Sequence, residues 1–398
     1  MGKVFINSQK FCFLNQIMSK NITILFLSFL LLTLTSCKDE HDGTDSQEEA
    51  EQTILLYFPW SGSDTTTGLY GLITDNLNDI KTVIANKKGL GNSRVMCVMS
   101  DSKSSAVMYE IRYRKGTCIC DTIKRFNNPD LTHSEGISTI LNAVINAAPA
   151  KEYGMIVGCH GSGWLPAEDS DFAKTRSYGG AGVKYSANID QLSEAIKETG
   201  QKLQFLLFDD CYMANVEVAY EMKDATNWLI ASTSEVIDKG IPYAQVFECL
   251  LNNPDYESLV SGFYDYYSTY YYPYGALSAI NCEAVENMAD VMRKINKDWT
   301  ADSSVIYQIQ TLDGYSPSVF FDMGDYVRHL CADPVLLEEF EGALKELVPY
   351  FKTTKYIYSE LSHSAFKVNT FSGITISDPS INKIAAGKTD TKWWESTH

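Results

Sequence analysis

The strongest constraint on the fold of this chain is a regular alternation of short apolar runs with amphipathic segments between Thr53 and Ser232. The apolar runs are nearly continuous, which is typical of strands buried on both faces. We expect strands at Ile54–Phe58, Arg94–Met99, Tyr153–Cys159, Leu203–Phe208 and Trp228–Ser232, and a hairpin of Val107–Tyr113 with Thr117–Thr122. We expect helices at Leu69–Ile84, Gly136–Ala148, Ile189–Thr199 and Met213–Met222. The pattern predicts an α/β fold, with a mostly parallel sheet covered by helices on both faces.

The pattern is less regular beyond residue 250. The dense run of tyrosines between Tyr256 and Tyr274 favours a tightly packed aromatic helix pair over a stacking surface for a ligand. Phe371–Ser377 is expected to form one last strand. We therefore predict one α/β domain over residues 53–250, with an α+β region over residues 251–398 packed on it.

The N-terminal segment has the features of an export signal. Ile22–Leu34 is an apolar run preceded by Lys20, too short to span a bilayer but suited to the core of a signal peptide. The run leads into Leu34-Thr35-Ser36-Cys37, which resembles a bacterial lipobox, a motif whose Cys receives a lipid. We therefore predict a lipoprotein signal peptide over residues 1–36 and lipidation of Cys37, with an ordinary signal peptide or a short anchor helix as the alternative.

Residues 37–52 are polar and acidic, and they predict a solvated tether. An acidic stretch after the lipid-bearing Cys is similar to lipoproteins of the Bacteroides type that are displayed at the cell surface. The resemblance implies a location in the cell envelope, with lipid anchoring to the outer membrane and exposure at the surface.

Charge and cysteine content exclude several classes of function. The formal net charge of -17 argues against nucleic acid as a partner, since such binding needs clustered Lys and Arg. Of ten Cys, the close pair Cys118 and Cys120 fits no zinc spacing. A chain of 398 residues needs no disulfide framework, although one or two bridges stay open. We expect no cofactor.

Two of the predicted strands end in chemically reactive residues. The third strand leads into Cys159-His160-Gly161-Ser162-Gly163-Trp164, and the fourth into Asp209-Asp210-Cys211-Tyr212-Met213. Because the carboxyl ends of neighbouring parallel strands meet at one edge of a sheet, His160 and Cys211 are expected to meet there. A thiol needs a base or a helix N-terminus nearby to become a nucleophile at neutral pH, and this arrangement offers both.

The order and spacing of these residues match a known arrangement. His160 precedes Cys211 by 51 positions, close to the spacing of the caspase His and Cys. The two motifs, Cys-His-Gly-Ser-Gly-Trp and Asp-Asp-Cys-Tyr-Met-Ala-Asn-Val-Glu, resemble those of the clostripain family of cysteine peptidases. The similarity runs from about Ile54 to about Pro379 and includes Thr74-Asp75-Asn76-Leu77 and Gly373-Ile374-Thr375-Ile376.

The resemblance implies a caspase-like sheet and a cysteine endopeptidase acting on proteins or peptides. Cys211 would be the nucleophile that forms a thioester, and His160 the general base and later the acid. The backbone N–H groups of Cys211 and Gly161 would form the oxyanion hole. The family cleaves after Arg or Lys, so Asp209, with Asp238 as the weaker candidate, would bind the basic side chain of the substrate.

Members of the family often cut themselves between the His and the Cys. The polar loop 167–185 contains Lys174 and Arg176, and these are the expected sites of self-cleavage. Some relatives use calcium, and the same loop holds Glu168, Asp169 and Asp171. Their spacing lacks the pattern of a coordinating loop, which favours a solvated loop over a metal site.

The chain departs from the family pattern at two positions. Cys159 stands where relatives usually carry Asp or another residue, and we interpret it as a packed strand residue. Asp210, beside the nucleophile, would raise the pKa of the thiol by like-charge repulsion, or it points away and caps the following helix.

Two alternative functions stay open at the level of the sequence. One is an inactive surface binding protein on a peptidase fold. The other is a peptidase of the same clan that cleaves after Asn or Asp.

Overall fold

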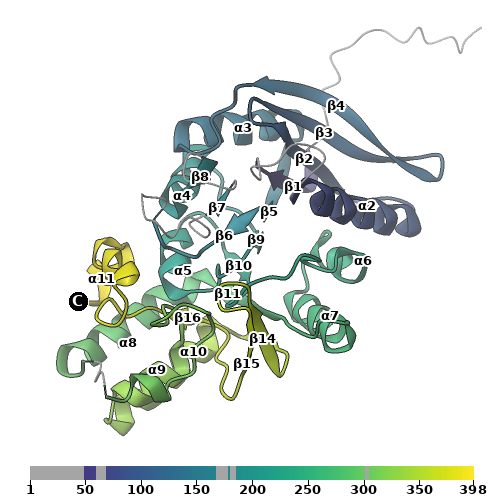
Figure 1. The fold of residues 1–398 in the computed structure, drawn as a ribbon. Helices are drawn as coiled ribbons and strands as arrows, with labels where there is room; N and C mark the ends of the chain where they lie inside the picture. Colours follow the sequence, from purple (N-terminus) through teal and green to yellow (C-terminus); the bar gives the residue numbers. More distant parts are fainter. Residues whose placement is uncertain (1–48, 60–68, 167–177, 180–184, 301–303) are drawn as a thin grey trace, which may run out of the picture. The chain divides into compact units, whose positions relative to one another are not determined.

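The computed structural model describes residues 49–59, 69–166, 178–179, 185–300 and 304–398. Within this part of the chain, nine strands form a central sheet in the order β13-β11-β10-β9-β5-β1-β2-β3-β4 (Figure 1). Their bounds are β1 Ala50–Phe58, β2 Ser93–Ser102, β3 Ser105–Arg114, β4 Thr117–Asn127, β5 Ala150–Gly158, β9 Phe205–Asp209, β10 Trp228–Ala231, β11 Ala276–Asn281 and β13 Tyr350–Thr353.

The middle of the sheet is parallel and both edges are antiparallel. Strands β10, β9, β5, β1 and β2 run parallel to one another. The β3–β4 hairpin continues the sheet on one side, and β11 and β13 continue it on the other, all by antiparallel pairing. The predicted fold class is therefore confirmed: an α/β fold with a mostly parallel central sheet.

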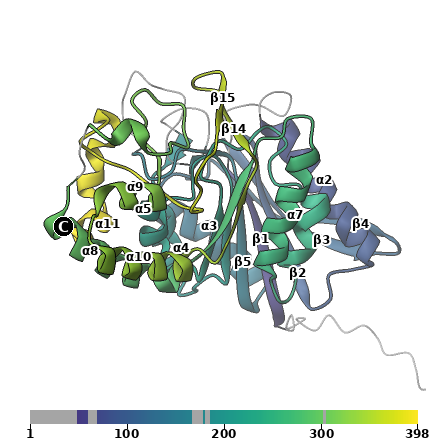
Figure 2. The ribbon, with the colours of Figure 1, turned by 90° about the horizontal axis from the view of Figure 1, so that it is seen from below.

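Helices cover both faces of the sheet, as Figure 2 shows. Residues of α2 (Leu69–Lys87), α6 (Tyr243–Val246) and α7 (Tyr256–Thr269) share one apolar cluster with Ile54, Leu56 and Phe58 of β1. The second cluster holds Leu55 and Tyr57 of β1, so successive residues of this strand enter opposite cores. It is completed by α3 (Ser134–Ala147), α4 (Ile189–Glu198), α5 (Val216–Met222), α8 (Val285–Asp298), α10 (Pro334–Leu347) and α11 (Lys392–Thr397).

Short strands and 3₁₀ turns complete the fold outside the main sheet. β6 (His160–Gly161), β7 (Tyr178–Gly179) and β8 (Ser186–Ala187) form a small antiparallel sheet. β12 (Phe321–Asp322) pairs with β16 (Thr375–Ile376), and β14 (Tyr356–Ser359) with β15 (Ser364–Lys367). The remaining elements are α9 (Met323–Leu330), η2 (Phe247–Leu250), η3 (Cys282–Ala284), η4 (Ile306–Gln308) and η5 (Lys383–Asp390).

Three expected elements differ from the structure. Helix α5 begins at Val216 rather than at Met213, because Tyr212 adopts a left-handed backbone (φ 62°) and Asn215 caps the helix. The tyrosine-rich stretch is a single helix, since the backbone of Tyr270 is already extended and Pro273 follows. The strand expected at Phe371–Ser377 shrinks to the two residues of β16.

The sheet crosses the predicted boundary at residue 250, because β11 and β13 join it from the C-terminal side. A boundary at this point stays a prediction. The predicted signal peptide and most of the tether lie outside the described residues. Among the helices that the structure describes, none is long and apolar enough to cross a membrane.

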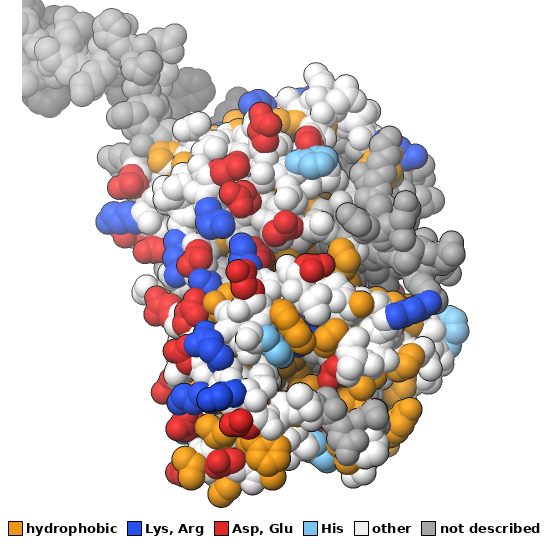
Figure 3. Space-filling model, turned by 90° about the vertical axis from the view of Figure 1, so that its left-hand side faces the viewer, with side chains coloured by type: hydrophobic (Ala, Val, Ile, Leu, Met, Phe, Trp, Pro, Cys, Tyr) orange, Lys and Arg blue, Asp and Glu red, His pale blue; other side chains and the backbone are white. Residues whose placement is uncertain are grey.

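The surface carries mixed charges. On the face shown in Figure 3, acidic and basic side chains are interspersed rather than separated by sign. Exposed ion pairs such as Lys294–Glu339 at 2.6 Å and Arg328–Glu341 at 2.7 Å join neighbouring helices. Each pair of this kind stabilises the fold by at most about 1 kcal/mol.

Candidate active site

The register of β5 and β9 brings the two candidate catalytic residues to equivalent positions. Gly154 pairs with Phe205, and the pairing continues without a shift to Gly158 and Asp209. The paired residues are always 51 positions apart, which is also the separation of His160 and Cys211. Both residues therefore lie two positions beyond the end of this pairing, at the carboxyl edge of the sheet.

His160 lies on the short strand β6, which pairs with β7 through His160 and Gly179. Its side chain reaches the surface. Protein atoms packed around the ring lower the pKa of His160 from its ordinary value, because they disfavour the charged imidazolium. The ring is thus biased toward the neutral form that a general base requires.

Cys211 lies in the tight turn between β9 and α5, and its side chain is partly buried. Its Sγ accepts a hydrogen bond from the Val236 N–H at 3.3 Å, and the thiol donates to the Val236 carbonyl at 3.7 Å. Burial raises the pKa of Cys211 to about 12, and the nearby Glu235 carboxylate adds to this effect. In this state Cys211 is a neutral thiol bonded to the loop after β10.

Gly161 packs directly against the nucleophile turn. A Cβ at this position would lie 2.6 Å from the carbonyl oxygen of Cys211 and 3.0 Å from its backbone nitrogen. Only glycine fits a contact this close, so the backbones of Gly161 and Cys211 can approach one substrate atom together.

Asp209 ends β9 and is partly exposed, with donors arranged around its carboxylate. Oδ1 accepts the Ile241 N–H at 2.8 Å, and Oδ2 accepts the Tyr243 hydroxyl at 3.0 Å. Burial raises the pKa of Asp209 to about 6, although these two donors and the nearby Lys239 oppose the rise. A carboxylate fixed in this way, with part of its surface open, can bind a cation.

Gly240 borders the same carboxylate. Its backbone is left-handed (φ 68°), and a Cβ there would lie 2.7 Å from Oδ1 of Asp209. Asp238, the weaker candidate for binding a basic side chain, is exposed in the adjoining loop. Tyr267 lies close to both carboxylates, since Asp209 and, more weakly, Asp238 add to the burial that raises its pKa.

Several predicted residues cannot be placed. Cys37, the cleavage candidates Lys174 and Arg176, and the three acidic residues considered for calcium (Glu168, Asp169 and Asp171) lie outside the described residues. Within the described part, no group of three or more His, Cys, Asp or Glu residues could hold a metal ion.

The prediction that Asp210 caps the following helix is wrong. Asn215 is the N-cap of α5, and its side chain accepts the Val218 N–H at 3.0 Å. Asp210 is buried and turns back toward β5, where it accepts the Cys159 N–H.

The loop after β10 supplies contacts to the nucleophile turn that the sequence analysis missed. Glu235 accepts the Tyr212 hydroxyl at 2.6 Å, and it also accepts the Ser359 hydroxyl and the Glu360 N–H at the end of β14. The ring of Tyr212 stacks on Phe320, with 5.2 Å between centroids. These contacts hold the residue after Cys211 in its left-handed conformation.

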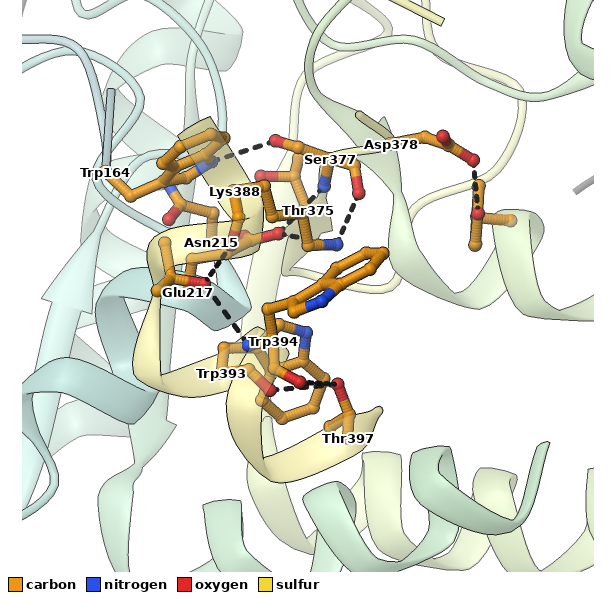
Figure 4. Close-up of polar contacts among 12 residues, drawn as sticks. Trp164, Asn215, Glu217, Thr375, Ser377, Asp378, Lys388, Trp393, Trp394 and Thr397 are labelled. Atoms are coloured by element: carbon orange, nitrogen blue, oxygen red, sulfur yellow. Dashed lines mark hydrogen bonds and ion pairs between the residues drawn. The ribbon is translucent and has the colours of Figure 1, made fainter. Parts of the chain in front are cut away.

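A buried network joins the C-terminal segment to both motifs, as Figure 4 shows. Trp164 donates from Nε1 to the Ser377 hydroxyl at 2.9 Å, and the Ser377 N–H donates to Glu217 of α5 at 3.0 Å. Lys388 forms a buried ion pair with Glu217 at 3.1 Å and also donates to the Ser377 carbonyl. The loop after His160 and the helix after Cys211 are thus tied to the same C-terminal segment.

Comparison with known proteins gives a consistent result. A model of the clostripain family matches residues 65–358. The structure is similar to that of "iotapain", a secreted C11 cysteine protease from Bacteroides thetaiotaomicron, with a TM-score of 0.83 and 40% identity over 88% of this chain and 99% of that chain.

Two further solved structures are similar. One is a clostripain from Bacteroides thetaiotaomicron in complex with the peptide inhibitor BTN-VLTK-AOMK, with a TM-score of 0.55 and 45% identity over 56% of this chain and 99% of that chain. The other, an inactive zymogen C11 protease from Parabacteroides distasonis, shares the fold at 23% identity, with a TM-score of 0.76 over 88% of this chain and 99% of that chain. Among curated protein sequences, none matches this chain.

These matches define the protein as a cysteine peptidase, a hydrolase that acts on peptides. The chain belongs to the clostripain family. The resemblance drawn from its two motifs is confirmed.

Proposed function

We propose that the chain is an endopeptidase that cleaves after Arg or Lys with Cys211 as nucleophile and His160 as base. The observation that supports the proposal is the unbroken register of β5 and β9, which ends at Gly158 and Asp209, two residues before His160 and two before Cys211. The exposed edge of His160 and the close packing of Gly161 on the nucleophile turn support the same assignment.

The reaction follows from these positions. Cys211 leaves its bond to Val236, gives its proton to the neutral ring of His160, and attacks the carbonyl carbon of the scissile bond. The N–H groups of Gly161 and Cys211 stabilise the negative oxygen of the intermediate. His160 then returns the proton to the leaving amine, and a water molecule hydrolyses the thioester with His160 as base.

Specificity for a basic side chain rests on Asp209. Its partly exposed carboxylate would accept hydrogen bonds from a guanidinium or an ammonium, while Asp238 would add charge at the entrance. An acidic substrate side chain would be repelled, which disfavours cleavage after Asp. The peptide inhibitor bound to the related clostripain, VLTK, ends in a lysine, in agreement with this assignment.

Self-cleavage after Lys174 or Arg176 is part of the proposal. These residues lie between the described strands β6 and β7, so a cut there would separate the two motifs. N-terminal sequencing of purified wild type and of Cys211→Ala tests it. We expect the cleaved fragments from wild type alone, and identical fragments from both proteins would rule out self-cleavage.

The location at the cell envelope is also a proposal. The related "iotapain" is described as secreted. We propose a lipid anchor on Cys37 that holds the enzyme at the outer membrane with its catalytic region exposed. Metabolic labelling with a fatty acid should mark wild type but not Cys37→Ser, and equal labelling of the two would refute the anchor.

The decisive experiment for activity is a set of fluorogenic peptides with Arg, Lys, Asn or Asp before the reporter group. Wild-type protein should hydrolyse the Arg and Lys peptides, and Cys211→Ala should hydrolyse none. Cys282→Ala is the matched control, because Cys282 is a buried cysteine at the far end of β11. Cleavage only after Asn, or equal cleavage by Cys211→Ala, would overturn the proposal.

A further inference from the structure

A buried contact joins the residues that directly precede the two candidate catalytic residues. The N–H of Cys159 donates to Oδ1 of Asp210 at 2.6 Å, and the Cys159 thiol lies 3.4 Å from Oδ2. Cys159 is 8% exposed and Asp210 is 1% exposed. The contact therefore crosses between β5 and β9 in the interior, one residue before His160 on one side and one residue before Cys211 on the other.

A third segment is tied to the same point. Gly179 of β7 donates its N–H to Sγ of Cys159 at 3.1 Å. Since Gly179 also pairs with His160, the Cys159 sulfur links the strand that carries His160, the turn that carries Cys211 and the short strand that follows the proposed cleavage segment. One side chain thus contacts three of the segments next to the dyad.

Among the residues that the structure describes, no cation is found to influence Asp210. The titratable groups close enough for mutual electrostatic influence are Cys159, Tyr178 of β7, Asp209, Cys211 and Tyr243 of α6. None of these five groups is a cation. A carboxylate buried without a cation is strongly unfavourable, and burial accordingly raises the pKa of Asp210 well above its ordinary value.

From this geometry we propose that Cys159 and Asp210 form a clamp that sets His160 and Cys211 relative to each other, and that Asp210 serves in it as an uncharged acid. The inference rests on the proposed function of the dyad. Asp210 accepts the Cys159 N–H through one oxygen and meets the thiol through the other, so both oxygens are used without a charge. While it is uncharged, Asp210 adds no negative charge beside Cys211; once ionised it would raise the pKa of the Cys211 thiol, as expected from the sequence.

Four variants separate positioning from folding. Asp210→Ala should lower kcat on an Arg peptide about tenfold and change KM less than twofold, because the dyad loses its alignment while the binding pocket is retained. Asp210→Asn keeps an acceptor and a donor in the same places and should recover most of the lost kcat. Cys159→Ala should lower kcat, and Cys159→Ser should recover it, since a hydroxyl can make the same contacts.

The charge state of Asp210 is read from the pH dependence of Cys211 alkylation by iodoacetamide, followed by mass spectrometry of the peptide that contains Cys211. If Asp210 is neutral, Asp210→Asn should leave the pKa of Cys211 within about 0.3 of wild type. If Asp210 is charged, removal of an adjacent negative charge should lower that pKa by about 1 or more. The second result would overturn the neutral state, and full kcat in both Asp210→Ala and Cys159→Ala would overturn the clamp.

The measurements distinguish this inference from the proposed function. Alkylation needs no turnover, so a wild type that cleaves no basic peptide would refute the proposed function and leave the charge test in place. If Asp210→Ala fails to fold, the kcat values of Cys159→Ala and Cys159→Ser decide whether the clamp positions the dyad. Cys282→Ala is the control for loss of a buried thiol, and it should keep full kcat.

Discussion

The pKa of Asp209 gives a quantitative prediction for the pH dependence of cleavage. Burial raises that pKa to about 6, and a basic side chain binds the charged form. The carboxylate is therefore fully available above pH 7 and is lost as the pH falls through 6. With a pKa of about 6, roughly 99% of Asp209 is charged at pH 8 and roughly 9% at pH 5, so kcat/KM on an Arg peptide should fall about tenfold through this group alone.

The loss of kcat/KM at low pH that is due to Asp209 has to be separated from the loss that is due to protonation of His160. The lowered pKa of His160 keeps its ring neutral to a lower pH, so the dyad should lose its base below the ordinary range. Alkylation of Cys211 by iodoacetamide involves no basic side chain, and it reports the dyad alone. We expect kcat/KM on the Arg peptide to fall at a higher pH than the alkylation rate of Cys211.

Substitution of Asp209 completes the test. Asp209→Asn removes a charge-assisted hydrogen bond of about 1.5–3 kcal/mol, which corresponds to a loss of about 10- to 150-fold in kcat/KM on Arg peptides. The alkylation rate of Cys211 at pH 8 serves as the control for an intact nucleophile turn. Two results together would refute the role of Asp209 in binding the basic side chain. The first is that peptide cleavage and Cys211 alkylation fall over the same pH range, and the second is that Asp209→Asn cleaves Arg peptides normally.

Three further substitutions have defined outcomes. Gly240→Ala should lower kcat/KM on basic peptides by about tenfold or more, because its Cβ would displace the Asp209 carboxylate; unaltered cleavage would contradict the close contact. Glu235→Gln should lower the pKa of Cys211 and speed its alkylation several-fold at pH 8, since a nearby negative charge is removed; a slower reaction would argue against this charge effect. Lys388→Met should reduce the free energy of unfolding by about 3–5 kcal/mol in urea titrations, because its buried carboxylate partner is left without a cation; a loss below about 1 kcal/mol would show that the pair matters little.

Strands buried on both faces could be read from the sequence because nearly every residue in them is apolar. Ile54–Phe58 and Leu203–Phe208 belong to this class, and both lie in the parallel core. The two-residue strands β6 and β7 have no periodicity to detect, and they are defined only by their pairing with each other. The length of β16 was likewise overestimated, since it depends on pairing with β12 rather than on its own pattern.

The residues of the candidate active site likewise fall into those that the sequence could predict and those that depend on tertiary packing. His160, Cys211 and Asp209 could be singled out because they lie at the carboxyl ends of buried strands or within two residues of them. Glu235 and Val236 also follow a parallel strand, β10, and that position was the available signal for them. The partner of Asp210 could not be derived, because two side chains at neighbouring strand ends can face toward each other or apart, and tertiary packing decides which.

The order of strands in the sheet has a consequence for a chain cut between residues 166 and 178. Every strand on one side of the β5–β9 pair precedes the cut, and every strand on the other side follows it. One piece would hold five strands of the sheet and the other four, and their shared boundary would be the β5–β9 pair, which ends two residues before His160 and Cys211. Neither piece alone would have a complete catalytic pair, so the cleaved enzyme would behave as a heterodimer whose activity depends on the association of its two halves. The N-terminal piece with His160 and the C-terminal piece with Cys211, each produced as a separate chain, should be inactive alone and should restore peptide cleavage when they are mixed.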